Sequence, residues 1–355
     1  MSGPVRWGLI GGGWLGRAFA APAIRASRGG ELVAVCDPSE EARRAVAAPW
    51  SGESAEQLLD RPEVEAVYIA TPNHLHAGAA IAATHAGKHV LCEKPMALCA
   101  DDAQRMVEAC RDAGVQYATA FDQRWHGGHR RLAEVVAQGG LGRVTLVRVH
   151  YACWTGPDWA PGRWAHDNWR VDPARAGGGA MIDLAPHGLD LAQTLLGERI
   201  TALHCLMQTA VHEVAVDDGA VLIGRTDAGT LVNLSVAYNC PDPLPRRRLE
   251  LVSTRATAIA VDTMGQDPGG RIELVDAASG VSRRLDFSSL DRSPFLNQVE
   301  AFNRAVRGEE PWPFDQWRDV HTQRLLDRAA ADGRGEQPPS SRVDVEPLAV
   351  GGDTR

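Results

Sequence analysis

A glycine-rich turn near the start of the chain constrains its fold more than any other feature. A short apolar run over residues 7–10 leads directly into three glycines spaced as G-x-G-x-x-G, namely Gly11, Gly13 and Gly16. The first allows a tight turn, the second lets a pyrophosphate approach the backbone, and the third lets the following helix pack closely on the strand. Unpaired N–H groups at the start of that helix favour phosphate binding. The stretch therefore predicts a dinucleotide-binding turn, which also contains Trp14 and Leu15.

An acidic residue follows at the distance that such a turn requires. The next apolar run, residues 32–36, ends in Asp37, about twenty residues after the last glycine. A carboxylate there accepts hydrogen bonds from the ribose hydroxyls and repels a 2′-phosphate, so we expect NAD as the cofactor. Arg43 and Arg44 are near enough in sequence to keep NADP as the alternative. A glycine-rich turn that binds nothing is the simpler interpretation, but the order of strand, glycines, helix, strand and acid favours the dinucleotide.

Two different patterns divide the chain. Residues 1–125 alternate β-type and helical segments, which predicts a Rossmann domain with a doubly wound parallel sheet. Residues 126–332 contain helical segments and short β-runs bounded by turn residues, which predict an α/β domain with a large, mostly antiparallel open sheet. Residues 333–355 have little helical pattern and are expected to form a tail. Because the β-runs of the second domain have no obvious cover in the sequence, we expect a homodimer or homotetramer.

The composition limits the class of partner. A formal net charge of −8 disfavours nucleic acid. No apolar run approaches the ~20 residues needed to cross a bilayer, and the first strand starts too near Met1 to leave room for a signal peptide. The seven cysteines are odd in number and include no C-x-x-C pair, which favours reduced thiols in a cytoplasmic protein. We therefore expect a small-molecule ligand and no membrane partner.

Loops at the carboxyl ends of parallel strands bind the ligands of such sheets. The loop over residues 71–76 holds two histidines, but no second ligand pair follows at metal spacing, so we expect contact with the cofactor and no metal. Lys94 ends a strand beside the expected nicotinamide position, where its charge can stabilise a developing alkoxide. Pro95 fixes the exit of the chain and can follow a cis peptide bond. An exposed lysine before a turn is the alternative interpretation.

A glycine run, residues 177–179, precedes a helical segment with a second set of reactive side chains. Asp183 and His187 are four residues apart and share one helix face, and Asp190 lies three residues further on. A carboxylate can fix the tautomer of a neighbouring imidazole and prepare it for proton transfer. Pro186 is expected to kink the helix or to start it. A capping aspartate and a structural histidine are the alternative.

Tryptophans recur every five residues before that glycine run, at Trp154, Trp159, Trp164 and Trp169. Five residues is neither a helix nor a strand period, so this is not an ordinary core stripe. Aromatic faces stack on the C–H surfaces of sugar rings, although apolar anchoring of a loop explains most of these residues equally well. Trp169 and Arg170, nearest the glycines, are the better substrate candidates.

Together these segments resemble the Gfo/Idh/MocA oxidoreductases, which include glucose–fructose oxidoreductase and inositol dehydrogenases. The resemblance runs from Val5 to about Ala331 and rests on GLIGGGWLG, ATPNHLH, VLCEKP, FDQRWH and GGGAMIDLAPHGLD, in the family's order. It implies a Rossmann domain followed by an α/β domain whose open sheet often buries a subunit interface. It also implies hydride transfer between NAD(P) and a sugar, cyclitol or related polyol.

The resemblance also implies roles for individual residues. Lys94 matches the family's EKP lysine, while His187 and Asp183 match its acid/base pair, with Asp183 orienting the imidazole. Expected cofactor contacts are Gly11, Gly13, Trp14, Leu15, Gly16, Asp37, Thr71, Pro72, Asn73, His76, Glu93, Lys94 and Arg124. Expected substrate contacts are Lys94, Arg124, Trp169, Arg170, Asp183, His187 and Asp190.

Two other functions would use the same residues. One is an NAD-using lyase, epimerase or glycosidase in which oxidation is transient and no net NADH forms. The other is a non-catalytic NAD(P)-sensing protein on the same fold, against which the intact set Lys94, Asp183 and His187 argues.

Overall fold

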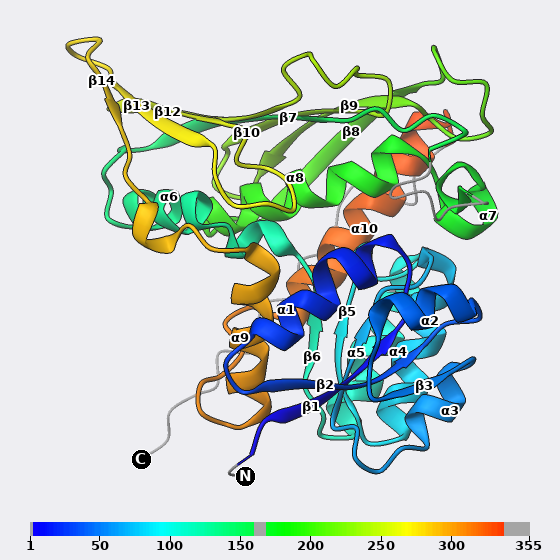
Figure 1. Cartoon of the computed structure of the whole chain (residues 1–355). Helices are drawn as coiled ribbons and strands as arrows, with labels where there is room; N and C mark the ends of the chain where they lie inside the picture. The colour runs from blue at the N-terminus through cyan, green and yellow to red at the C-terminus, as the bar shows by residue number, and fades with distance from the viewer. Residues whose placement is uncertain (1–2, 160–167, 337–355) are drawn as a thin grey trace.

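The computed structural model describes residues 3–159 and 168–336, which form two sheets with helices between and around them (Figure 1). One sheet belongs to the first part of the chain and the other to the second part. Trp164 and most of the expected tail, residues 337–355, lie outside the described residues.

The first sheet is parallel throughout, in the order β3-β2-β1-β4-β5-β6. Its strands are β1 (Val5–Ile10), β2 (Gly30–Cys36), β3 (Trp50–Gly52), β4 (Ala66–Ile69), β5 (His89–Cys92) and β6 (Tyr117–Thr119). Its helices are η1 (Gly16–Ala20), α1 (Ala21–Ala26), α2 (Glu40–Val46), α3 (Ala55–Leu59), α4 (His76–His85) and α5 (Ala100–Asp112). Separate apolar clusters pack on its two faces, which is typical of a parallel sheet between helix layers. The prediction of a doubly wound parallel sheet is confirmed.

The second sheet has the order β14-β13-β12-β11-β7-β10-β9-β8, and among the described pairs of this sheet only β10–β7 is parallel. Its strands are β7 (Val144–Ala152), β8 (Ile200–Gln208), β9 (Gly219–Thr226), β10 (Leu231–Ala237), β11 (Arg247–Ser253), β12 (Ala256–Val261), β13 (Arg271–Asp276) and β14 (Ser282–Arg284). Their burial alternates along the chain, as in β10, so one face of the sheet packs on helices. The large, mostly antiparallel sheet is confirmed.

Helix α8 (Ala180–Leu196) lies against the inner face of this sheet, beside α6 (Gly127–Ala137), as Figure 1 shows. It is buried on most of its surface, as expected of a helix enclosed between layers. Gly188 permits the close approach, because a Cβ there would lie 2.8 Å from Leu234 on β10. Pro186 lies inside α8, so the expectation that the helix starts at this proline is wrong.

Two later helices return to the first sheet. Helix α9 (Pro294–Val306) packs on α1 and β2, and its Phe302 ring lies 5.4 Å from that of Trp7 in β1. Helix α10 (Gln316–Gly333) contacts α5 on one side and β8 and α8 on the other, so it lies between the two sheets (Figure 1). Both helices come from residues predicted to belong to the second domain, and the boundary near residue 125 stays a prediction.

Candidate active site

The glycine turn after β1 forms the floor of a cleft of about 850 Å³ at the carboxyl ends of the parallel strands. Gly11 has a φ of +100°, and a Cβ on it would lie 2.6 Å from the carbonyl oxygen of Ala70. A Cβ on Gly16 would lie 2.2 Å from the carbonyl oxygen of Gly11, so this glycine is needed for close packing. Gly13 instead borders open space within the cleft. The three positions thus have the geometry that a pyrophosphate-binding turn needs.

Asp37 lies at the end of β2 and lines the same cleft. Its carboxylate accepts hydrogen bonds of 2.8 Å from the backbone N–H groups of Gly12 and Ser39. These bonds fix the carboxylate between the glycine turn and the start of α2. The acid is thereby positioned where a Rossmann fold binds the adenosine ribose.

The loop after β4 forms a second wall of the cleft, with Thr71, Pro72, Asn73 and His76 along it. The His76 ring lies 2.8 Å from the carbonyl oxygen of Pro95 and 3.0 Å from that of Thr71, so it ties two strand-end loops together. Burial lowers the pKa of His76 to about 4, which keeps the ring neutral near pH 7. The described residues contain no cluster of three or more potential metal ligands.

The segment after β5 carries Glu93 and Lys94, and the peptide bond from Lys94 to Pro95 is cis. Glu93 accepts a 2.7 Å hydrogen bond from the Tyr68 hydroxyl, and burial raises its pKa to about 7 despite that bond. The Lys94 ammonium donates to the Asp183 backbone oxygen at 2.8 Å and to its carboxylate at 2.6 Å. Lys94 therefore links the first domain's strand end to helix α8.

Asp183 does not orient His187, and that expectation is wrong. Its two carboxylate oxygens accept hydrogen bonds from Lys94 and from the Tyr238 hydroxyl, the latter at 2.8 Å. Burial alone would raise the pKa of Asp183, but the charges of Lys94 and Arg170 outweigh it and hold the pKa well below its usual range. Asp183 is thus a fixed anion that positions Lys94.

The acid that faces His187 is Asp122, in the short helix η3 (Asp122–Trp125) after β6. His187 Nδ1 lies 3.3 Å from the Asp122 carboxylate, without hydrogen-bond geometry, and its ring lies edge-on to Tyr151 at 5.4 Å. Sequence reasoning missed this acid, although it stands inside FDQRWH at a strand end where ligand-binding loops were expected. Tyr238 and Tyr151 gave no such signal, because they belong to ordinary-looking β-runs.

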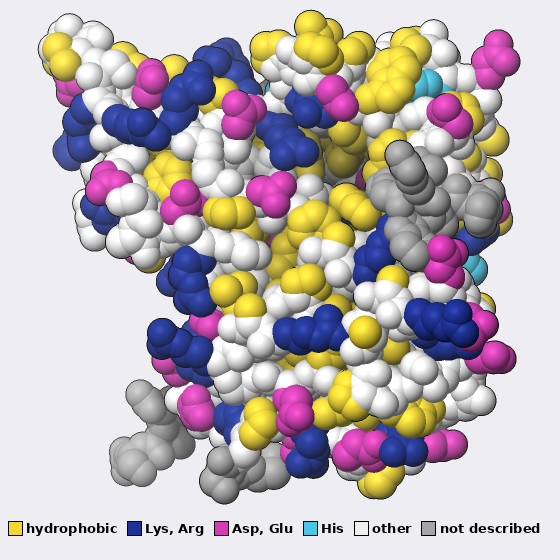
Figure 2. Space-filling view, in the orientation of Figure 1, with side chains coloured by type: hydrophobic (Ala, Val, Ile, Leu, Met, Phe, Trp, Pro, Cys, Tyr) yellow, Lys and Arg dark blue, Asp and Glu magenta, His cyan; other side chains and the backbone are white. Residues whose placement is uncertain are grey.

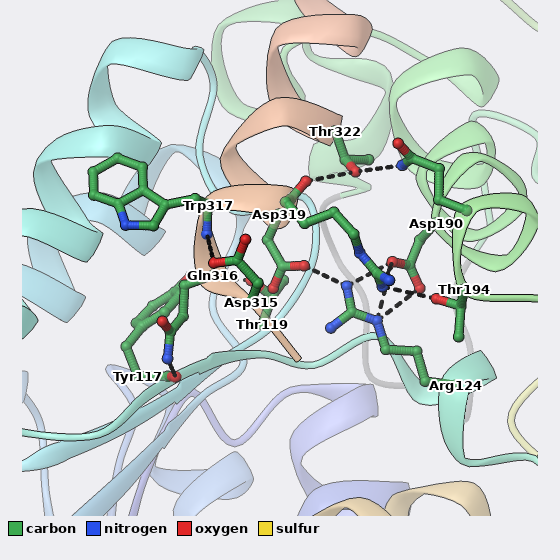
Figure 3. Close-up of polar contacts among 12 residues, drawn as sticks. Tyr117, Thr119, Arg124, Asp190, Thr194, Asp315, Gln316, Trp317, Asp319 and Thr322 are labelled. Atoms are coloured by element: carbon green, nitrogen blue, oxygen red, sulfur yellow. Dashed lines mark hydrogen bonds and ion pairs between the residues drawn. The ribbon is translucent and has the colours of Figure 1, made fainter. Parts of the chain in front are cut away.

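Arg124 and Asp190 lie in a closed ion cluster and do not line the cleft (Figure 3). Arg124 forms hydrogen bonds with both Asp190 oxygens, at 2.5 to 3.0 Å, and also bonds Asp319 of α10. Arg318 adds a second cation, 3.1 Å from Asp190. Because the side chains of Arg124 and Asp190 are 0% exposed, their expected contacts with cofactor and substrate are corrected to a structural role.

A smaller cavity of about 210 Å³ adjoins the cleft and is lined by Lys94, Asp183 and His187. The two hollows share part of their lining, namely Trp14, Leu15, Glu93, Lys94, Arg170 and Asp183. Of the tryptophan series, Trp159 lines the smaller cavity and contacts Trp14 edge-on at 5.6 Å, whereas Trp169 lines the larger cleft. Trp154 is exposed and packs against His212. Figure 2 shows apolar side chains gathered between the upper and lower parts of this face of the molecule.

Comparison with known proteins agrees with this geometry. Residues 5–121 match the family model described as "Oxidoreductase family, NAD-binding Rossmann fold", and residues 129–259 match "GFO/IDH/MocA C-terminal domain". The chain therefore belongs to the Gfo/Idh/MocA family, and it is an NAD(P)-dependent dehydrogenase or reductase. The resemblance inferred from the motifs is confirmed.

Individual relatives cover most of the chain. It is 32% identical over 309 residues to 1,5-anhydro-D-fructose reductase of Ensifer adhaerens, which covers 85% of this chain and 88% of that protein. It is 28% identical to myo-inositol 2-dehydrogenase of Thermotoga maritima, covering 86% and 90% of the two chains. The solved structure of levoglucosan dehydrogenase with NADH and levoglucosan has a TM-score of 0.82 at 22% identity, covering 94% and 98%. That last likeness concerns the fold.

The described helices include none with both the length and the apolar character needed to span a membrane.

Proposed function

We propose that this chain oxidises a hydroxyl group of a sugar, cyclitol or related polyol, or reduces the matching ketone, with NAD as its redox partner. The observation that carries the proposal is the smaller cavity, where Lys94 and His187 border a space that shares part of its lining with the cleft above the glycine turn. Several relatives support the substrate class by name, since they are reductases or dehydrogenases of 1,5-anhydro-D-fructose, levoglucosan and myo-inositol.

The contacts of two arginines favour NAD over NADP. Arg43 donates to the backbone oxygens of Asp37 at 2.6 Å and Pro38 at 3.1 Å, and lies 3.6 Å from the Glu53 carboxylate. Arg44 pairs with Glu40 on the exposed side of α2. Both cations thus have partners of their own, and the Asp37 carboxylate would repel a 2′-phosphate.

Open space beside Gly13 and the fixed Asp37 carboxylate fit a dinucleotide along the cleft. When bound, NAD supplies the hydride acceptor at its nicotinamide ring. Lys94 would donate to the reacting oxygen and stabilise the alkoxide that develops on it. His187 would accept the hydroxyl proton, and the Asp122 carboxylate, 3.3 Å from Nδ1, would stabilise the resulting imidazolium. Asp183 would keep the Lys94 ammonium in place.

The outer face of the large sheet supports a homodimer or homotetramer. Strands β8, β9 and β10 expose Leu206 (79%), Val221 (45%), Ile223 (54%) and Leu231 (53%) there, and Leu206 pairs directly with Val221. We call these four residues the outer apolar patch. A contiguous apolar patch on an open sheet is typical of a subunit interface. Leu206→Lys with Ile223→Lys should lower the mass measured by light scattering at micromolar concentration, whereas Val281→Lys, on an exposed turn, should not.

The test of the function is a panel of sugars and cyclitols incubated with NAD⁺. NADH formation is measured by absorbance, and the products are analysed by chromatography. We expect at least one pyranose or cyclitol to be oxidised with one NADH per product. Turnover without net NADH would instead indicate a lyase, epimerase or glycosidase. Tight NADH binding without turnover of any compound would indicate a sensing protein.

The unpaired state of all seven cysteines supports a reducing, cytoplasmic location.

A further inference from the structure

Two guanidinium groups line the smaller cavity without an ion pair or hydrogen bond to a carboxylate of the described residues. Arg247 is the first residue of β11, and Arg170 belongs to the short helix η5 (Trp169–Val171). Arg170 lies over the rings of Trp159 and Trp169, at 4.8 and 4.4 Å. Neither side chain takes part in an ion pair or a side-chain hydrogen bond with residues 3–159 or 168–336.

The acidic groups of the cavity are already engaged. Asp183 holds Lys94, and Asp122 faces His187. Glu93 accepts from Tyr68, and the burial that raises its pKa keeps it largely neutral below about pH 7. Among the described residues the cavity therefore has more cationic than anionic side chains: the charge of Arg170 already acts on Asp183, and Arg247 is left without a carboxylate partner.

The position of Arg247 is that of a binding group. Its Nη1 atom lies beside Gly265, where a Cβ would be only 2.0 Å away, so glycine leaves the room that the guanidinium occupies. Its Nε atom is buried and has no hydrogen-bond partner among the described residues. An unsatisfied buried donor is unfavourable, and an acceptor that reached it would relieve this cost.

We propose that the substrate carries a carboxylate and that Arg247 binds it, with Arg170 bordering the same group. This inference rests on the proposed function, since it names the class of sugar: a uronic acid or a related sugar acid. Guanidinium presents a planar fork of N–H donors that matches the two oxygens of a carboxylate.

The arrangement around Tyr151 agrees with a single sugar ring. The Tyr151 ring lies 5.4 Å from the His187 ring and 5.6 Å from the Arg247 guanidinium carbon, so it contacts both groups. The reacting hydroxyl and the carboxylate would thus belong to different positions of one ring. A cavity of about 210 Å³ is small beside the roughly 300–1,000 Å³ of sites for larger ligands, which favours a monosaccharide acid over a nucleotide sugar.

The test compares matched substrates that differ only at C6: D-glucose with D-glucuronate, and D-galactose with D-galacturonate, with D-glucose 6-phosphate as a third arm. For the unaltered protein we expect kcat/KM for a uronate to exceed that for its neutral partner by about tenfold or more, as one charge-assisted bidentate contact provides. Arg247→Met should lower this uronate-to-neutral ratio by a similar factor, mainly through KM, because the carboxylate is remote from the reacting carbon. Arg247→Lys should retain part of the ratio.

Arg246→Met is the matched control, since Arg246 is the preceding residue, pairs with Asp242 and does not line the cavity. The uronate-to-neutral ratio of kcat/KM in Arg246→Met should equal that of the unaltered protein. Quenching of tryptophan fluorescence measures uronate binding to the NADH complex and gives a second readout that is independent of turnover. Arg247→Met should weaken this binding.

Each outcome separates this inference from the proposed function. Oxidation of neutral sugars without a uronate preference would overturn the carboxylate assignment and leave the function standing. A preference for the 6-phosphate over both uronates would also overturn it. If no compound of either class were oxidised, the proposed function itself would fall.

Discussion

Two ion clusters join helix α8 to strand ends of the parallel sheet, and they differ in their access to the cleft. In each, a cation from a strand end of the parallel sheet meets an aspartate of α8: Lys94 meets Asp183, and Arg124 meets Asp190. The Lys94 and Asp183 side chains are 10% and 23% exposed, whereas Arg124 and Asp190 are both 0% exposed. The first pair can therefore contact a ligand, and the second, whose contacts are drawn in Figure 3, can only hold the helix in place. Similar residue types on one helix thus have separate roles, decided by solvent access.

The largest expected effect is on turnover, when the partly exposed pair of Lys94 and Asp183 is altered. Lys94→Met should lower kcat by about 100-fold or more, because it removes the charge that would stabilise the developing alkoxide. Steady-state kinetics on the best substrate of the panel measures this. Lys88→Met is the control, since Lys88 precedes the same strand at its opposite end and donates to the Arg61 backbone oxygen. A similar loss in both variants would contradict a specific role for Lys94.

A change in the buried cluster of Arg124, Asp190 and Asp319 should lower the stability of the protein. Arg124→Met would leave Asp190 and Asp319 buried without their main cation, so the free energy of unfolding should fall by about 3–5 kcal/mol. Denaturant unfolding checks this against Arg105→Met, which removes an exposed pair with Asp102 and should cost less than about 1 kcal/mol. Equal losses in the two variants would show that burial does not distinguish the pairs.

Glu93, next to Lys94, provides a pH-dependent comparison. Its pKa is about 7 in the folded protein, against a usual value of 4.5. The native carboxyl therefore keeps a proton that the unfolded chain loses between these values, and the free energy of unfolding should fall as pH rises through this window, by about 3 kcal/mol. Glu93→Gln should remove this contribution. Denaturant titrations at pH 4.5, 6 and 8 measure the difference, and identical pH dependence in both proteins would refute the burial argument.

The smallest expected effect is on nucleotide affinity and concerns Asp37, which lines the cleft at the end of β2. The unaltered protein should bind NADH more tightly than NADPH, and Asp37→Ala should narrow the gap by about tenfold, or about 1.4 kcal/mol. Isothermal titration with both nucleotides tests this. Asp60→Ala, which alters an exposed aspartate after α3, should leave the ratio of the two affinities unchanged. Equal or tighter NADPH binding to the unaltered protein would contradict the role of Asp37.

Local patterns predicted much of the fold. The glycine turn, the alternation of strands and helices, and the β-run at residues 247–253 all have their expected structure, because each depends on neighbours in sequence. The helix that carries Asp183 and His187 was also expected. Pro186 left two alternatives, a helix kinked there or one starting there, and the helix in fact runs through it, buried between two layers.

The side-chain partners could not be predicted in the same way. Asp319 reaches Arg124 across 195 positions of sequence, and Asp183 takes Lys94 and Tyr238 as partners although His187 stands one turn away. Such choices depend on how α8 and α10 are placed between the two sheets. Spacing along one helix shows which residues share a face, but not what lies opposite that face. The residues that line the larger cleft were easier to predict, because the cleft is built from the ends of adjacent strands.

The central claim is that His187 carries the proton, and its most direct test is the pH dependence of His187→Ala. In the unaltered protein, log kcat/KM for oxidation should rise with pH, as general-base catalysis requires. In His187→Ala this limb should disappear and kcat should fall by about 10²–10⁴-fold, while NADH affinity should change little because His187 does not line the larger cleft. A His187→Ala enzyme with near-normal turnover and an unchanged pH profile would contradict the account and leave Lys94 or a water chain as the base.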